Sequence, residues 1–480
     1  MSVTSLLIPS LHWTGARGFD ADRKLIDRAL ALGVGGFILY GGEVDAVRQL
    51  IKELRQRSSV PLLIAADMER GAGQQFTGAT GLPPLAAIAS LNDPDAVRRA
   101  ARLTAREART LGVSWAFAPV CDVDVAPDNP IIGTRALGTN AQRVGELAAI
   151  WIKACQSEGV LACAKHYPGH GRTTTDSHLE LPTVDATKQE LFDVDLIPFR
   201  AAIAAGVAAM MTAHVAYPAL DASGVPATLS REMLQWLLRQ QFHFDGLIVS
   251  DSLVMEGVIT GRSEGAVAVA ALNAGCDLLL YPGDLEAVAS TLVNALEKHE
   301  LNPDLVQQSE RRRQKWAQWA SPPNEYRKPS STDIAWGQQL ADRVVRMVRG
   351  ARPALQSPLE VIVVDDDTPD RPTPTVATPF VDALRADGWT VRVLDTRAPR
   401  ESLVPMIALF GEAHAGKGRA GYSDATQALM QELCDEMPDA LVLQFGHPRL
   451  IRELPGARAI ATAWGGEPAM QQAAARWIAR

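Results

Sequence analysis

The stretch VLACAKHY (residues 160–167) decides the fold, because it is a nearly continuous apolar run that ends in ionisable side chains. A β-strand buried on both faces has this pattern, and such strands are typical of parallel sheets. Similar runs lie on both sides of it: SLLIPSL (5–11), GVGGFILY (33–40), VPLLIAAD (60–67), VSWAFAPV (113–120), AAMMTAHV (208–215), GLIVSDSL (246–253) and DLLLYPG (277–283). Amphipathic stretches such as residues 96–111 separate them. Eight strands, each followed by a helix, predict a (β/α)8 barrel of the TIM type. A doubly wound open sheet is the alternative, but its Gly-rich first turn is missing.

The rest of the chain predicts a smaller α/β sandwich domain. Residues 321–331, SPPNEYRKPSS, are rich in Pro and Ser and predict a linker, and a helix is expected over 333–348. Five further apolar runs follow: LEVIVVDD (359–366), WTVRVLD (389–395), MIALFGE (406–412), ALVLQFG (440–446) and ARAIATAW (457–464). We therefore expect a barrel over residues 1–320, a linker and connecting helix over 321–356, and an α/β sandwich over 357–480.

Composition narrows the class of protein. The 480 residues carry 47 basic and 55 acidic side chains, a net charge of −8, which argues against nucleic acid or an anionic membrane as a partner. The first residues lack a basic stretch before an apolar run, and no apolar stretch approaches the roughly 18 residues of a membrane span. The five cysteines are scattered without a CxxC pair, which argues against a disulfide framework or a thiolate zinc site. We expect a soluble, cytoplasmic protein.

Ionisable residues end several of the predicted barrel strands. In a (β/α)8 barrel the carboxyl ends of the strands meet on one rim, which carries the active site. One aspartate at such a position could simply cap the helix that follows it, but five runs ending in this way predict a shared site. The residues concerned are Asp67, Asp122, Lys165 with His166, His214, and Asp251.

The segment KHYPGHGRTTTDSH (165–178) is the densest in such side chains. His166 and His170 are four residues apart, but Pro168 lies between them, so they cannot share a helix face as in a zinc-binding HExxH motif. We therefore predict no metal ion and no cofactor. A Schiff-base role for Lys165 would require a desolvated amine, whereas its neighbours favour a hydrogen-bonding lysine.

Asp176, Ser177 and His178 offer a second kind of chemistry. In an extended loop, residues i and i+2 point the same way, so the carboxylate can hold one imidazole nitrogen and leave the other for proton transfer. A histidine satisfied by ordinary loop contacts is the alternative. Gly169 and Gly171 should make this loop mobile enough to reach a substrate.

These segments and their neighbours also carry a family resemblance. They are AADMERGAGQQF (65–76), FAPVCDVDVAPDNPIIGTRALG (117–138), AKHYPGHGRTTTDSHLELP (164–182), MTAHVAYPALD (211–221), FDGLIVSDSLVMEGV (244–258) and ALNAGCDLLLYPGD (271–284). In this order they closely resemble the bacterial β-N-acetylglucosaminidase (β-hexosaminidase) branch of glycoside hydrolase family 3. The resemblance covers residues 1–320, and residues 357–480 are similar to the sandwich domain of two-domain members.

The resemblance implies a retaining exo-glycosidase that removes terminal β-linked N-acetylglucosamine from an oligosaccharide. The substrate would be a cell-wall muropeptide, as in cell wall recycling, or a chitin-type oligosaccharide. Asp251 is implied as the nucleophile that forms a covalent glycosyl-enzyme, His178 as the acid/base and Asp176 as its partner. The residues implied to bind the sugar or line its pocket are Asp67, Arg135, Lys165, His166, His214 and Asp122.

The sequence also departs from the family pattern. Gln75 stands where the family's DQEGGRVQR-like segment has an arginine, and Arg70 is a shifted arginine that could compensate. A β-glucosidase, a phosphorylase that uses Arg172 to bind phosphate, and a non-catalytic sugar-binding barrel therefore stay open as alternatives. Because the dyad is intact, we predict no catalytic residue in the second domain, where the candidates are Glu412, His414 and Lys417.

Overall fold

The computed structural model describes residues 2–259, 261–320, 330–366, 374–394, 405–411 and 416–480. The chain divides into two compact units. The first unit spans residues 1–80, 94–126 and 136–330, and the second spans 81–93, 127–135 and 331–480. Two segments from within the first 320 residues thus belong to the second unit. Within the described ranges, none of the helices combines the length and the apolarity needed to cross a bilayer.

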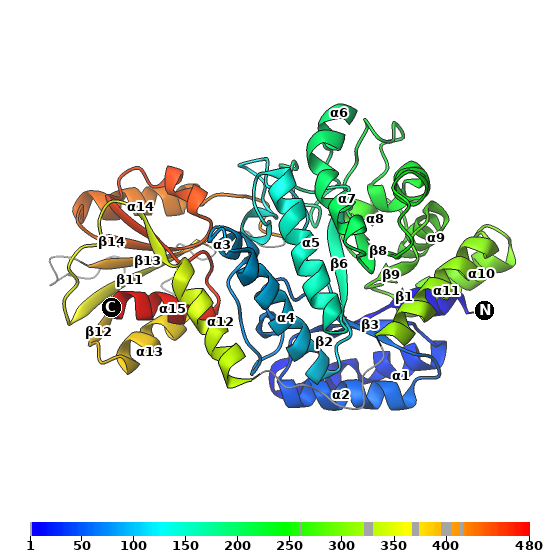
Figure 1. The fold of residues 1–480 in the computed structure, drawn as a ribbon, viewed down its shortest axis with the longest axis horizontal. Helices are drawn as coiled ribbons and strands as arrows, with labels where there is room; N and C mark the ends of the chain where they lie inside the picture. The colour runs from blue at the N-terminus through cyan, green and yellow to red at the C-terminus, as the bar shows by residue number, and fades with distance from the viewer. Residues whose placement is uncertain (1, 260, 321–329, 367–373, 395–404, 412–415) are drawn as a thin grey trace. The chain divides into compact units, whose positions relative to one another are not determined.

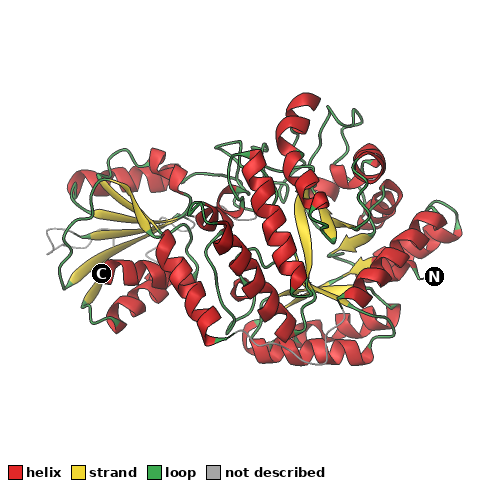
Figure 2. Cartoon of the chain, viewed as in Figure 1, coloured by secondary structure: helices red, strands yellow, loops and turns green. Residues whose placement is uncertain are grey.

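The first unit is the predicted barrel of parallel strands (Figures 1 and 2). Its strands after the first run are β3 (Gly36–Tyr40), β4 (Leu63–Ala66), β5 (Trp115–Ala116), β6 (Leu161–Tyr167), β7 (Ala209–Thr212), β8 (Leu247–Ser252) and β9 (Leu278–Leu280). The first run is divided by Pro9 into β1 (Leu7–Ile8) and β2 (Ser10–His12). β1 pairs with β9 and β2 pairs with β3, so this one run closes the barrel.

Helices cover the outside of the barrel. The longer ones are α1 (Arg23–Leu32), α2 (Val44–Arg57), α4 (Pro94–Leu111), α5 (Ala141–Ser157), α7 (Ile197–Ala204), α9 (Glu264–Ala274), α10 (Leu285–Glu297) and α11 (Pro303–Trp319). α5 packs between α4 and α7 (Figure 1). In α4 the alanines and leucines face the sheet while Arg99 and Arg102 lie exposed, as the amphipathic pattern predicts.

The strand expected over residues 113–120 is shorter than predicted. Only Trp115–Ala116 forms a ladder, since Pro119 has no N–H to donate and the chain leaves the sheet before it. The chain returns at Val120, which forms an isolated bridge with Lys165 of β6. This return brings the next residues, including Asp122, beside the carboxyl end of β6.

The second unit is a three-layer α/β sandwich. Its strands are β10 (Arg346–Arg349), β11 (Leu359–Asp365), β12 (Val391–Leu394), β13 (Met406–Phe410), β14 (Leu441–Phe445) and β15 (Ala459–Thr462). The order is β10-β15-β14-β13-β11-β12, with β10 antiparallel to β15 and the other pairs parallel. One face packs on α12 (Ser331–Val344), α13 (Thr378–Ala386) and α15 (Pro468–Ala479), and the other on α14 (Asp424–Glu436). The helix predicted over 333–348 therefore ends at Val344, and residues 346–349 form an unpredicted edge strand.

Candidate active site

The ionisable residues predicted at the strand ends gather at the carboxyl rim of the barrel. Asp67 directly follows β4, Lys165 and His166 belong to β6, and Asp251 belongs to β8. His214 lies two residues beyond β7. Ion pairs and electrostatic interactions connect these groups, as the following paragraphs describe.

Lys165 is the centre of a buried charge cluster. Its Nζ lies 2.7 Å from a carboxylate oxygen of Asp67 and 2.7 Å from one of Glu69, and its side chain is 2% exposed. Two carboxylates at this distance favour the protonated amine, so Lys165 serves as a hydrogen-bond donor rather than as a free nucleophile. Glu69 was not predicted from the sequence. Its position two residues after Asp67, in the same loop, is the only signal that could have found it.

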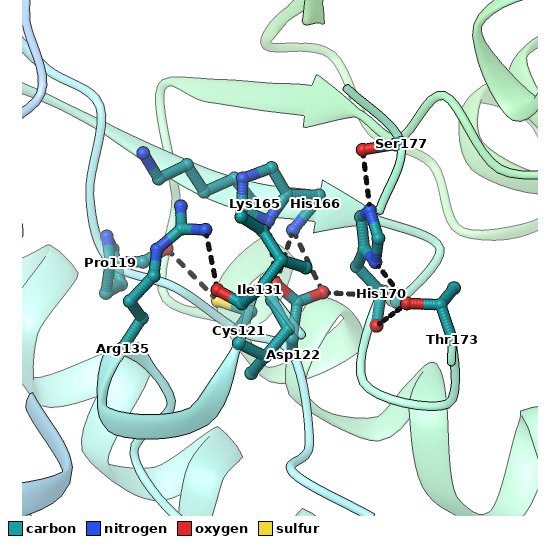
Figure 3. A network of polar contacts seen from close by, with 12 residues as sticks. Pro119, Cys121, Asp122, Ile131, Arg135, Lys165, His166, His170, Thr173 and Ser177 are labelled. Atoms are coloured by element: carbon teal, nitrogen blue, oxygen red, sulfur yellow. Dashed lines mark hydrogen bonds and ion pairs between the residues drawn. The ribbon is translucent and has the colours of Figure 1, made fainter. Parts of the chain in front are cut away.

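Asp122 supports the histidines beside the cluster, as Figure 3 shows. Its wholly buried carboxylate accepts hydrogen bonds from Nδ1 of His166 (2.7 Å) and from the backbone N–H groups of His166 (3.1 Å) and His170 (2.6 Å). Burial alone would raise the pKa of Asp122, but the interactions with His166 and His170 lower it below its usual range. Asp122 therefore stays charged and fixes the His166 ring. In the described part of the chain, no group of three or more His, Cys, Asp and Glu side chains could hold a metal ion.

The loop after β6 places His178 on Asp176. Nδ1 of His178 lies 2.7 Å from Oδ1 of Asp176, which also accepts the His178 backbone N–H at 2.9 Å. The Asp176 side chain is fully buried, whereas that of His178 is 35% exposed. The carboxylate orients the ring, and no residue in the described ranges hydrogen-bonds Nε2, which is the nitrogen left for proton transfer.

The same loop is fastened at several points, although its glycines predict mobility. Nε2 of His170 lies 3.0 Å from Oγ of Ser177, and Nδ1 lies 2.7 Å from Oγ1 of Thr173 (Figure 3). Arg172, the candidate phosphate ligand, is paired at 2.7 Å with the buried carboxylate of Asp195. Its charge is therefore already balanced within the protein.

Asp251 presents an ionised carboxylate at the end of β8. Its Oδ1 accepts the backbone N–H of Ser252 at 2.7 Å. Burial would raise the pKa of Asp251, but the nearby His166 and the Ser252 N–H, with a smaller contribution from His178, lower it below its usual range. Asp251 is thus charged at neutral pH, as a nucleophile must be.

His214 makes contacts on both sides of its ring. One ring nitrogen, Nε2, lies 2.9 Å from the carbonyl oxygen of Ser252, which can only accept, so Nε2 carries the proton. Nδ1 then accepts from Oγ1 of Thr228 at 2.7 Å. Burial lowers the pKa of His214, which keeps the ring neutral. His214 therefore anchors the end of β8 next to Asp251.

Arg135 and Gln75 are the two remaining predicted features. Arg135 belongs to the second unit, where its Nη1 donates to the carbonyl of Ile131 at 3.1 Å (Figure 3). Its contact with a sugar stays a prediction. Gln75 accepts the backbone N–H of Gly41 at 3.1 Å, so the residue in the arginine's place fastens the loop after β3.

Of the second-domain candidates, Glu412 and His414 lie outside the described residues. Lys417 is described, and its ammonium lies 2.8 Å from the buried carboxylate of Asp366. Arg419 pairs with the same carboxylate at 2.7 Å. Lys417 thus makes a structural contact within the second unit.

Known glycosidases match this chain. The model of the glycosyl hydrolase family 3 N-terminal domain matches residues 18–315. A beta-hexosaminidase of Thiobacillus denitrificans is 40% identical over 280 residues, which are 56% of this chain and 76% of that protein. A beta-N-acetylglucosaminidase/beta-glucosidase of Cellulomonas fimi is 37% identical over 265 residues, which are 53% of this chain, and the match spans only 47% of that longer protein. The structure of a glycoside hydrolase family 3 beta-N-acetylglucosaminidase from Paenibacillus sp. str. FPU-7 superposes with a TM-score of 0.84 at 28% identity, covering 100% of this chain and 96% of that one.

Proposed function

Because this chain belongs to glycosyl hydrolase family 3, and is therefore a glycoside hydrolase, we propose that it is a retaining, exo-acting β-N-acetylglucosaminidase. Asp251 is the proposed nucleophile, and His178 with Asp176 is the proposed acid/base pair. The observation that carries the proposal is the pairing on one rim of an ionised carboxylate with a carboxylate-bound imidazole close enough to lower its pKa. A retaining glycosidase needs a nucleophile and a proton donor on either side of the scissile bond.

In the first step, a carboxylate oxygen of Asp251 attacks the anomeric carbon while protonated His178 donates its Nε2 proton to the leaving oxygen. A covalent glycosyl-enzyme and a free alcohol result. In the second step, neutral His178 removes a proton from water, whose oxygen attacks the anomeric carbon and releases Asp251. Asp176 stabilises the imidazolium of the first step and keeps Nδ1 occupied throughout.

The charge cluster of Lys165, Asp67 and Glu69 is the proposed binding site for the sugar hydroxyls. Asp67 is its most accessible member, so its carboxylate is the group placed to accept from a hydroxyl. Lys165 keeps that carboxylate ionised and in a fixed position. N-acetylglucosamine is the proposed sugar because similar proteins carry the names beta-hexosaminidase and beta-N-acetylglucosaminidase. A cytoplasmic role in cell wall recycling, as the resemblance implies, belongs to the same proposal.

The test is to trap the intermediate. A fluorinated N-acetylglucosaminyl fluoride slows the second step, so the sugar should remain attached and peptide mass mapping should locate it on Asp251. Asp251→Asn is the matched control, since it keeps the shape of the side chain and removes the attacking charge, and it should take up no label. A label on another residue would contradict the assignment of the nucleophile.

A β-glucosidase is the second candidate. Gln75, in place of the arginine expected from the resemblance, favours it, and so does the double name of the Cellulomonas fimi relative. The ratio of kcat/KM for p-nitrophenyl β-N-acetylglucosaminide and for the β-glucoside decides between the two. Activity on neither substrate, with correct folding, would favour a non-catalytic sugar-binding barrel.

A further inference from the structure

Three aromatic side chains complete the rim of the barrel between Asp251 and Asp67. The strand order runs from β8 through β9 and the first run to β3 and β4. In that order the rim carries Asp251, then three aromatic residues, then Asp67. The aromatic residues are Tyr281 just after β9, His12 at the end of β2 and Tyr40 at the end of β3. None of the three has a part in the mechanism above.

Strand register places these rings on the face that carries Asp67. His12 and Tyr40 are direct partners in the β2–β3 ladder, and their rings stack with centroids 4.9 Å apart and planes 10° apart. In the β3–β4 ladder Ile38 is opposite Ala65, so Tyr40 is level with Asp67 two residues further along. Side chains at equal register in neighbouring parallel strands point to the same face. Tyr40 therefore points to the face from which Asp67 contacts Lys165.

Tyr281 reaches the same cluster through an uncommon backbone conformation. Its φ is +52°, in the left-handed region that bulky residues rarely adopt. Such a conformation persists only where the surroundings impose it, and it is frequent at functional sites. It puts the Tyr281 ring 5.4 Å from that of His12 and 5.9 Å from that of Tyr40.

The Tyr40 hydroxyl is held as a hydrogen-bond donor. Burial, and then the charges of Asp67 and Asp251, raise the pKa of Tyr40 well above its usual range, so the phenol keeps its proton. Within the described ranges no residue hydrogen-bonds this hydroxyl. A largely buried tyrosine normally finds a partner for its O–H. A bound sugar would supply one.

We propose that His12, Tyr40 and Tyr281 form an aromatic wall against the apolar C–H face of the terminal sugar, and that the Tyr40 hydroxyl donates a hydrogen bond to one of the sugar's hydroxyls. The inference rests on the proposed function, since Asp251 and Asp67 then flank that same sugar. Sugar pockets combine apolar and aromatic surface with a few placed polar groups, and here one half of the rim supplies each. The wall thus makes Tyr40 and Tyr281 specificity-determining residues.

The hydroxyl is tested with Tyr40→Phe on p-nitrophenyl β-N-acetylglucosaminide and its 3-, 4- and 6-deoxy analogues. The variant should lose roughly two- to tenfold in kcat/KM with the parent sugar, the range for one neutral hydrogen bond. It should lose nothing further with the one analogue that lacks the bonded hydroxyl. Tyr422→Phe, a buried tyrosine of the second unit, is the matched control and should be unaffected. Equal losses on all four sugars would overturn the hydrogen bond.

The wall is tested with Tyr281→Asn and Tyr281→Phe. Asparagine tolerates the left-handed conformation but removes the ring, so KM should rise several-fold, whereas phenylalanine should retain the wild-type KM. An unchanged KM in Tyr281→Asn would overturn the wall. In each variant, trapping with the fluorinated sugar separates the two proposals: a label on Asp251 leaves the proposed function intact whatever the kinetics show, and its absence from wild-type protein would refute that function itself.

Discussion

Replacing Lys165 by methionine should destabilise the barrel and make its stability depend on pH. The substitution keeps the length of the side chain but leaves the carboxylates of Asp67 and Glu69, each 2.7 Å from the lost ammonium, without their shared cation. Removing one partner of a buried ion pair costs about 3–5 kcal/mol, because the remaining charge stays desolvated. Natural domains are stable by about 5–15 kcal/mol, so the variant should fold at 25 °C with much of its margin lost.

The loss should be smaller at pH 5 than at pH 8. The two carboxylates repel each other in the folded variant and are separated in the unfolded chain, so the folded state binds a proton more readily. By linkage, the variant then recovers stability as the pH falls, opposite to an ordinary salt-bridged acid. Urea unfolding followed by tryptophan fluorescence at the two pH values measures this, since Trp115 and Trp151 are buried in the barrel.

A second substitution supplies the internal control. Lys165→Met combined with Glu69→Gln removes one of the two repelling charges, so the double variant should be more stable than Lys165→Met alone at pH 8. Destabilisation of less than about 1 kcal/mol, the size of an exposed pair, would refute the reasoning. A double variant no more stable than the single one would refute it as well.

Three other predictions follow from the site and from the second unit. His178→Ala should slow the first step by about 10²–10⁴-fold for natural sugars and much less for p-nitrophenyl glycosides, which need little protonation; pre-steady-state kinetics over a series of leaving groups tests this, and equal losses would make His178 structural. Millimolar phosphate should leave the products unchanged, since Arg172 is already paired with Asp195, and accumulation of N-acetylglucosamine 1-phosphate would contradict this. Burial would raise the pKa of Asp366, but hydrogen bonds with Lys417 and the Ser423 N–H lower it to about 2, so its contribution is complete above its unfolded pKa near 3.8 and is lost as the pH falls through 2. Asp366→Asn should therefore lower stability by about 2 kcal/mol at pH 7 and hardly at all near pH 2, and thermal melts at the two pH values check this.

The barrel could be predicted because its strands are buried on both faces and therefore appear as apolar runs. The division of the first run at Pro9 and the shortness of β5 could not, since an apolar run does not show where its ladder begins and ends. The association of residues 81–93 and 127–135 with the second unit depends on contacts distant in sequence, such as Ala87 in the core of that unit. No local pattern encodes such contacts.

The charged half of the site could be predicted from the position of each residue at a strand end. The aromatic half could not, because Tyr40 and Tyr281 end apolar runs and look like ordinary strand residues. Only the register of β2, β3 and β4, and the left-handed turn at Tyr281, bring those rings to the rim. Glu69 was missed for a related reason, since it lies in a loop and acquires its role from Lys165 on a distant strand.

The closure of the barrel by its first run has a consequence for biosynthesis. Leu7 pairs with Leu279, so the strand that leaves the ribosome first completes its pairing only after 272 further residues have been added. At about 5–20 residues per second, that interval is on the order of 15–50 seconds. During this time the nascent chain exposes an apolar strand with one unpaired edge, which is the kind of surface that chaperones bind and that aggregates grow from. Synthesis speed and chaperone supply should therefore affect the yield of this protein more than that of a similar chain whose neighbouring strands are all consecutive.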